Sequence, residues 1–191
     1  LWARCPHRID NAKTIMLRAI RIVIFRIQMF AIRRRLRNVK LFVCDVDGVL
    51  TSGTLLYAAD GLVLKQFSVY DGLGIKQIQK LEINVAILSG GDGSAIEARA
   101  KNLGIVHVFT DVVDKRQTLI ELQSVTQIAI EDTLFVGDDV NDLAIRDLVS
   151  LFIAPANAVK AVRRKADVVL TRTGGNSCIR QLTDEIVKVH R

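Results

Sequence analysis

The sequence has little cysteine and proline, and it has no uninterrupted run of apolar residues long enough for a membrane span. Its three cysteines, Cys5, Cys44 and Cys178, are scattered and form no Cys-x-x-Cys pair. This excludes a disulfide framework and a cysteine zinc site, and it favours a reducing compartment, by default the cytoplasm. Two prolines and twelve glycines in 191 residues, half of them hydrophobic, exclude disordered and collagen-like chains. We therefore expect one folded domain with at most a short appendage.

Charge is distributed unevenly along the chain. The net charge is +7, yet residues 1–40 hold eleven basic residues and one acidic residue, a net charge of +10. The other 151 residues hold sixteen basic and nineteen acidic residues, a net charge of −3. The basic character thus belongs to the N-terminal arm, which argues against nucleic acid as a partner of the rest of the chain.

The apolar stretch 15–32 of this arm is interrupted by three arginines, Arg18, Arg21 and Arg26. Each would cost about 2.5–3.5 kcal/mol at the centre of a bilayer, so we do not expect the stretch to span one. Three interpretations remain open: a dispensable extension over residues 1–38, a basic amphipathic helix that contacts a membrane surface or a partner through residues 15–32, and a targeting peptide.

From residue 39 onward, short apolar runs alternate with helical patterns, which predicts an α/β fold. The expected architecture is a three-layer, Rossmann-like parallel sheet with helices on both faces. The predicted strands are Leu41–Val46, Val85–Leu88, Val106–Phe109, Leu134–Val136, Leu151–Ile153 and Val168–Leu170. The predicted helices are Gly72–Leu81, Gly93–Leu103, Lys115–Ser124, Asn141–Leu148 and Asn157–Lys165.

One segment after the first strand departs from this alternation. Two apolar runs, Leu55–Tyr57 and Val63–Val69, flank a turn that contains Asp60 and Gly61. Asp-Gly between apolar runs indicates a β-hairpin. Placed there, the hairpin would form a small flap over the carboxyl ends of the strands, where doubly wound folds bind ligands.

Two acidic clusters follow predicted strands. Asp45 and Asp47 end the first strand, and Asp138, Asp139 and Asp142 follow the fourth. Buried carboxylates without a partner are costly, and neighbouring parallel strands bring their carboxyl ends together. Oxygen ligands without His or Cys favour Mg²⁺. The sequence therefore predicts a magnesium site.

Two further strand ends supply groups that a phosphate would need. Ser89 and Gly90 offer a hydroxyl and backbone amides before a helix, and Lys115 offers a positive charge at the start of another. Each signal is weak alone. The order Asp-x-Asp, Ser, Lys, Gly-Asp-Asp after successive strands is the informative feature.

These four motifs resemble those of the haloacid dehalogenase superfamily of phosphotransferases over about residues 40–190, so we expect a domain of that type at residues 39–191 after the extension 1–38. The hairpin, the segment Ser68–Lys76 and the late Thr173-Gly174-Gly175 are similar to its small-cap phosphatases of keto sugar acids, whose substrates include 3-deoxy-D-manno-octulosonate 8-phosphate.

The resemblance implies a role for each matching residue. Asp45 would be the nucleophile that forms an aspartyl-phosphate, and Asp47 the general acid and base. Mg²⁺ would be held by the Asp45 carboxylate, the Asp47 backbone carbonyl and Asp138. Ser89 and Lys115 would bind the phosphoryl oxygens. Asp139 and Asp142 would orient Lys115 and metal-bound water, and the expected substrate contacts are Asp71, Gly72, Lys76, Gly90 and Arg99.

Tyr70 and Gly91 stand where that group usually carries arginines, so the contacts to a sugar carboxylate differ here. The resemblance also implies a homotetramer in which the apolar hairpin residues Leu55, Leu56 and Leu62 contact a neighbouring subunit. The alternative to an enzyme is a catalytically idle oligomerisation or regulatory domain, as in some acylneuraminate cytidylyltransferases. The presence of all the matching catalytic residues favours the enzyme. A phosphoacceptor receiver domain fits less well, because it lacks Asp-x-Asp-Gly and the hairpin.

Overall fold

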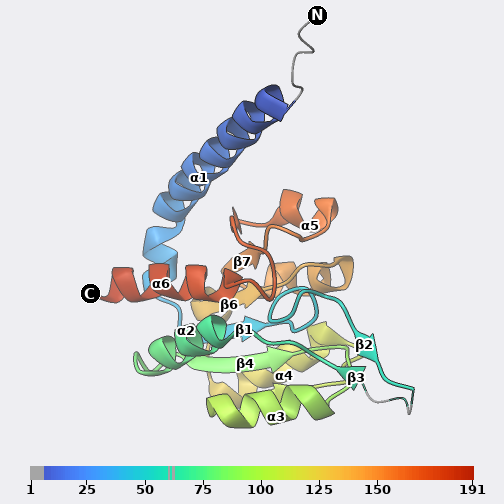
Figure 1. The fold of residues 1–191 in the computed structure, drawn as a ribbon. Coiled ribbons are helices and arrows are strands. Elements are labelled where there is room, and N and C mark those ends of the chain that lie inside the picture. Colours follow the sequence, from blue (N-terminus) through green and yellow to red (C-terminus); the bar gives the residue numbers. More distant parts are fainter. Residues whose placement is uncertain (1–6, 60, 62) are drawn as a thin grey trace, which may run out of the picture.

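The computed structural model describes residues 7–59, 61 and 63–191, and for residues 7–13 only the backbone. Its centre is a six-stranded parallel sheet with the order β5-β4-β1-β6-β7-β8 (Figure 1). The strands are β1 (Leu41–Cys44), β4 (Asn84–Leu88), β5 (His107–Phe109), β6 (Thr133–Val136), β7 (Leu151–Ala154) and β8 (Val168–Val169). This confirms the predicted fold class.

Helices cover both faces of the sheet because the inner strands are apolar on both sides. Phe42 and Cys44 of β1 pack against one layer, while Leu41 and Val43 pack against the other. The first layer consists of α1 (His7–Arg37), α2 (Val69–Gln79), α3 (Ser94–Leu103) and α6 (Cys178–His190). The second consists of α4 (Lys115–Thr126), the 3₁₀ helix η2 (Val140–Leu148) and α5 (Lys160–Lys165). A short 3₁₀ turn, η1 (Ile130–Asp132), precedes β6.

The helix α6 was not predicted from the sequence. Its first turn lacks a side-chain cap of its own, since Ser177 lies in the left-handed region and makes no capping bond. The cap comes from α2, where the Asp71 Oδ1 accepts a hydrogen bond of 2.7 Å from the backbone N–H of Arg180. A start signal supplied by another helix cannot be found in the local sequence.

Two predicted helices differ in form. The segment at 140–148 is 3₁₀ rather than α-helical, and the one at 157–165 is helical only from Lys160. The reason for the shortening is local: the Val159 N–H donates to the Asp138 carbonyl at 2.9 Å, which holds the preceding residues against the β6 loop.

The N-terminal arm forms one helix of 31 residues, α1. Its C-terminal half packs into the core through Phe25, Met29, Ile32 and Leu36, each at most 8 % exposed. Its N-terminal half projects away from the body (Figure 1). Within the described part of the chain, no helix is both long and apolar enough to cross a membrane. A domain boundary at residue 38 stays a prediction, although Phe25, Met29, Ile32 and Leu36 belong to the packed core.

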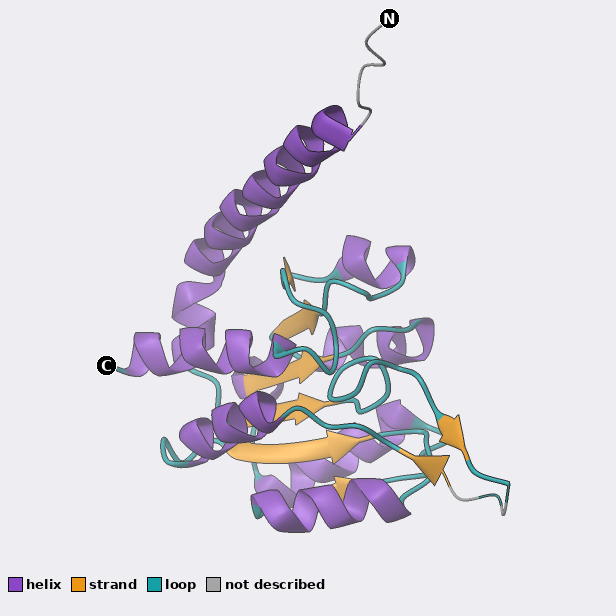
Figure 2. Cartoon of the chain, in the orientation of Figure 1, coloured by secondary structure: helices purple, strands orange, loops and turns teal. Residues whose placement is uncertain are grey.

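The predicted hairpin is present as β2 (Leu56–Tyr57) and β3 (Val63–Leu64), paired antiparallel. Asp60 and Leu62 of its turn lie outside the described residues. The hairpin lies on the side toward which the strands of the sheet point (Figure 2). Leu55 and Leu56 are 38 % and 60 % exposed, so they do not pack fully on their own domain.

Candidate active site

Asp45 directly follows β1 at the centre of the sheet and is buried. Its backbone N–H donates to the carbonyl of Val136 on β6 at 3.0 Å, which extends the ladder by one residue. Its Oδ1 accepts from the Val46 N–H at 2.7 Å, and its Oδ2 lies 3.2 Å from the Lys115 Nζ. The carboxylate is therefore fixed between a backbone amide and a buried cation.

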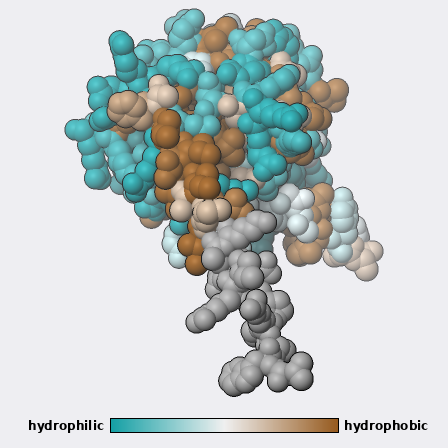
Figure 3. Space-filling view, turned by 90° about the horizontal axis from the view of Figure 1, so that it is seen from above, coloured by the Kyte–Doolittle hydropathy of each residue, from teal (hydrophilic) through white to brown (hydrophobic). Residues whose placement is uncertain are grey.

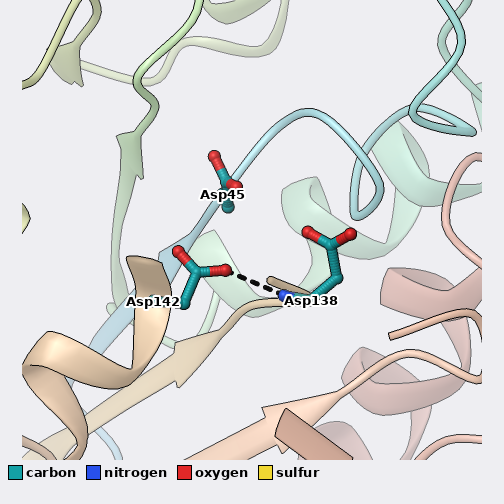
Figure 4. A group of neighbouring side chains, drawn as sticks. All are labelled: Asp45, Asp138 and Asp142. Atoms are coloured by element: carbon teal, nitrogen blue, oxygen red, sulfur yellow. Dashed lines mark hydrogen bonds between the residues drawn. The ribbon is translucent and has the colours of Figure 1, made fainter. Parts of the chain in front are cut away.

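The loop after β6 and the first turn of η2 bring two more carboxylates, Asp138 and Asp142, to this point (Figure 4). The Asp142 Oδ2 accepts from the backbone N–H groups of Asp138 and Asp139 at 2.8 and 3.2 Å, while its Oδ1 accepts from Lys115 Nζ at 2.6 Å. Oxygens of Asp45, Asp138 and Asp142 lie within 4.8 Å of one another. Asp142, predicted as an orienting residue, does contact Lys115 and also belongs to the acidic cluster itself.

The cluster has the properties of a site for a hard divalent cation. Burial, followed by the charges of Asp45, Asp142 and Asp139, raises the pKa of Asp138 to about 7. Burial and the charge of Asp142 raise the pKa of Asp45 to about 6. The Asp138 Oδ1 is buried and has no hydrogen-bond partner among the described residues. A cation with oxygen ligands would relieve the repulsion and satisfy this oxygen, so the residues fit Mg²⁺.

The loop after Asp47 leaves space beside Asp138 because residue 48 is glycine. Gly48 has a φ of +88°, and a Cβ there would lie 2.0 Å from the Asp138 Oδ2. The late glycine pair packs on the same loop: a Cβ on Gly174 would meet the Gly48 carbonyl oxygen. Asn157 ties the two segments together, donating to that carbonyl at 2.9 Å and accepting from the Gly174 N–H at 2.7 Å.

The Asp47 side chain is not part of the acidic cluster. Its Oδ2 lies 2.5 Å from the Lys65 Nζ, and its Oδ1 accepts from the Thr51 hydroxyl at 3.3 Å. Lys65 follows β3, and its side chain is only 3 % exposed. The hairpin thus contributes a cation directly to the site. The expectation that the Asp47 carbonyl binds Mg²⁺ stays a prediction.

Ser89 follows β4 and is buried, and its Oγ accepts from the Gly91 N–H at 3.2 Å. The predicted residues at the ends of the three strands share a polar cavity of about 340 Å³. It is lined by Asp45, Asp47, Gly53, Ser89, Gly90, Gly91, Asp138, Asp139 and Asn141. Lys115 lies beneath it, paired with Asp45 and Asp142.

Four of the five predicted substrate contacts lie outside this cavity, whereas Gly90 lines it. Asp71 caps α6, and Lys76 is exposed on α2. Arg99 donates to the Ser68 carbonyl at 2.9 Å, and it lies so close to Gly72 that a Cβ there would be 2.4 Å from its Nη2.

The Asp139 carboxylate forms no ion pair with Lys115, whose partners are Asp45 and Asp142, and its expected contact with metal-bound water stays a prediction. It caps η2 instead, accepting from the Val140 N–H at 2.7 Å. As the first residue before a helix, it is better placed to satisfy free backbone amides than to reach a neighbouring element.

Sequence reasoning missed Lys65 and Asn157. The signal for Lys65 was its position directly after the second hairpin strand, since the hairpin was expected to overhang the site. Nothing local distinguishes Asn157, because its two partners, Gly48 and Gly174, are 109 and 17 residues away.

Comparison with known proteins gave one family model and many relatives. The model of haloacid dehalogenase-like hydrolases matches residues 75–179. The 3-deoxy-D-manno-octulosonate 8-phosphate phosphatase KdsC of Haemophilus influenzae is 36% identical over 156 residues, 82% of this chain and 87% of the relative.

Solved structures show the same similarity. The 3-deoxy-D-manno-octulosonate 8-phosphate phosphatase of Yersinia pestis superposes with a TM-score of 0.81 at 34% identity, covering 83% of this chain and 85% of that one. The enzyme of the same name from Moraxella catarrhalis, in complex with magnesium ion, phosphate ion and a KDO molecule, gives a TM-score of 0.81 at 33% identity, covering 83% and 91%.

Proposed function

The chain belongs to the haloacid dehalogenase-like hydrolase family, and from this premise we propose that it is a Mg²⁺-dependent phosphatase of small phosphorylated sugar acids. The observation that carries the proposal is that Asp45, Asp138 and Ser89 line one polar cavity at the carboxyl ends of adjacent strands, with Lys115 paired to Asp45. Carboxylates, a hydroxyl and a buried lysine in this arrangement provide a nucleophile together with groups that neutralise a phosphoryl dianion.

Asp45 is proposed as the nucleophile. One of its oxygens attacks phosphorus, the bond from phosphorus to the sugar oxygen breaks, and an aspartyl-phosphate forms. Water then attacks phosphorus and releases inorganic phosphate together with the free Asp45 carboxylate. Lys115, held at 3.2 Å from the Asp45 Oδ2, keeps positive charge next to the attacking group.

Asp47 is proposed to protonate the leaving sugar oxygen and afterwards to take a proton from the hydrolytic water. Its contact with Lys65 holds the carboxylate on the hairpin side of the cavity. Thr51 fixes the other oxygen. Two contacts from different segments therefore fix the orientation of the Asp47 carboxylate.

Mg²⁺ would be held by Asp45 and Asp138, with the Asp47 carbonyl as a further ligand. When bound, it neutralises phosphoryl charge and offsets the repulsion between the carboxylates. Ser89 is proposed to bind a phosphoryl oxygen, because its hydroxyl and the Gly91 amide lie together at the cavity wall.

The substrate proposal is 3-deoxy-D-manno-octulosonate 8-phosphate, on the basis of the named relatives. The space beside Gly91 is taken by Asp47 and Lys65. A Cβ at position 91 would lie 2.7 Å from the Asp47 Oδ2 and 3.3 Å from the Lys65 Nζ. Lys65 thus places its charge beside position 91. We propose that it supplies the contact to an anionic group of the sugar that an arginine at position 91 would otherwise make.

A second copy of the chain is proposed to complete the cavity, in a homotetramer. The hairpin alone covers little of it, and its residues Leu55, Leu56 and Tyr57 are exposed. Cys44 and Cys178 are buried free thiols, which supports the cytoplasm as the compartment.

The test is phosphate release by the purified chain with Mg²⁺ and with chelator, across sugar phosphates that include keto acid phosphates of eight and nine carbons. Asp45→Asn should abolish release, while Asp147→Asn, an exposed aspartate paired with Arg116, should leave it unchanged. Mg²⁺-dependent release without preference for keto acids would overturn the substrate proposal alone. No release by a folded chain that binds Mg²⁺ would overturn the enzyme and favour an idle oligomerisation domain.

A further inference from the structure

The helix α1 carries two apolar faces, of which only one is used by the body. The used face consists of Phe25, Met29, Ile32 and Leu36, which are all buried. At 100° per residue these four point in nearly one direction. Farther toward the N-terminus the same direction is taken by Arg18 and Arg21, both exposed. The body-facing stripe is therefore apolar where it meets the body and charged where it extends beyond it.

From Met16 to Phe30 the opposite face is apolar, and one turn farther on it ends at Arg34. Within about 60° of the direction that points away from the body lie Met16, Ile20, Val23, Ile27 and Phe30. Their exposed fractions range from 45 % to 79 %, with Phe30 the most exposed. Packing on the body does not explain this face, because all five side chains are at least 45 % exposed. Figure 3 shows apolar side chains exposed on the surface seen from above, among hydrophilic ones.

The charge of α1 decides what can cover this face. From residue 14 to residue 37 the helix holds seven arginines and no acidic residue. A second copy of α1 would bring two such helices together, and their like charges oppose that pairing. A surface of anionic lipids is complementary, because it accepts the apolar face while arginine side chains reach its phosphates.

The dimensions agree with a helix that lies on a membrane. The face from Met16 to Phe30 is about 21 Å long at 1.5 Å per residue, shorter than the roughly 30 Å core of a bilayer. Because this face is opposite the body, contact with a membrane would not require α1 to leave its place on α6 and β8. Neither the cavity at the carboxyl ends of the strands nor the hairpin takes part.

We propose that the N-terminal half of α1 binds the surface of anionic lipid membranes through Met16, Ile20, Val23, Ile27 and Phe30, with the exposed arginines holding it to the headgroups. The full chain should cosediment with vesicles of phosphatidylcholine and phosphatidylglycerol, and not with vesicles of phosphatidylcholine alone. Binding should fall as salt rises, because screening shortens the reach of the arginines.

Matched variants distinguish binding through this apolar face from nonspecific adsorption to vesicles. Ile20→Gln/Ile27→Gln should lose vesicle binding, whereas Ile22→Gln, an exposed isoleucine on the arginine side, should keep it. Each of Arg26→Gln and Arg34→Gln, exposed arginines that flank and continue the apolar face, should lower the affinity roughly fivefold. Circular dichroism and thermal unfolding would establish that all variants are folded, independently of any phosphatase activity.

Two results would overturn the proposal. One is a wild-type chain that does not cosediment with the anionic vesicles, or that binds neutral vesicles equally well. The other is a smaller oligomer for Ile20→Gln/Ile27→Gln by light scattering with vesicle binding unchanged, which would show that a second copy covers the face.

Discussion

Replacing Lys115 by methionine tests the buried charge network at the centre of the site. The Lys115 side chain is 4 % exposed and lies 3.2 Å from the Asp45 Oδ2 and 2.6 Å from the Asp142 Oδ1. Burial lowers the pKa of this lysine, but the charges of Asp45 and Asp142 and their hydrogen bonds outweigh it, so its pKa is raised. Methionine keeps most of the apolar stem and removes the charge.

The expected loss is that of a buried ion pair broken on one side, about 3–5 kcal/mol of the free energy of unfolding. For a domain of this size each kcal/mol corresponds to roughly 2–4 °C, so the Tm should fall by about 6–20 °C in chelator. Mg²⁺ should restore part of this loss, because without the lysine charge the carboxylates should bind the ion more tightly. Each tenfold lower Kd adds about 1.4 kcal/mol to the stability of the variant relative to the wild type.

The assay is thermal unfolding with chelator and with Mg²⁺, alongside Lys188→Met as the control. Lys188 forms an exposed pair with Glu185, which is worth about 0–1 kcal/mol. Adding Asp142→Asn to Lys115→Met should recover part of the stability, since it removes one uncompensated charge. A loss for Lys115→Met no larger than that for Lys188→Met would refute the reasoning, as would an equal loss with and without Mg²⁺.

Three further predictions concern the metal site, the hairpin and the N-terminal helix. The pKa of Asp138 is raised to about 7 from about 3.8, so the folded state binds the proton of this carboxyl more tightly than the unfolded state does. In chelator, the contribution of Asp138 to the free energy of unfolding should therefore fall as pH rises from about 4 to about 7. Mg²⁺ should therefore raise the Tm more at pH 8 than at pH 5, and Asp138→Asn should shrink this difference to the part that Asp45, with its pKa raised to about 6, contributes. Equal shifts in the wild type would contradict it. Lys65→Met should raise KM for keto acid phosphates more than for a neutral sugar phosphate, because it removes a cation beside Asp47, and equal effects on both substrates would argue against a substrate contact. Removing residues 1–24 should leave the Tm of the body within about 2 °C of that of the full chain. Removing residues 1–37 should lower the free energy of unfolding by several kcal/mol, because this truncation deletes the buried side chains of Phe25, Met29, Ile32 and Leu36. Equal Tm values for the two truncations would contradict this.

The sequence alone determined the fold class and the chemical centre of the site. Continuous apolar runs such as Leu41–Cys44 indicate strands covered on both faces, and their alternation with helical patterns leaves a parallel sheet as the simple solution. In such a sheet the residue after a strand lies at the carboxyl edge by construction of the fold. Asp45, Ser89 and Asp138 each follow a strand, so their meeting was predictable from order alone.

Only the tertiary structure decided how the remaining residues are used. From the sequence, Asp71 is predicted to contact the substrate. In the structure it caps α6, because the first turn of that helix lies beside α2. Asp142 joins the acidic cluster, whereas Asp139 lines the cavity but uses its Oδ1 to cap η2. Lys65 reaches Asp47 only because the hairpin folds back on the sheet. These roles depend on contacts between distant segments, and local sequence patterns carry no information about which of them form.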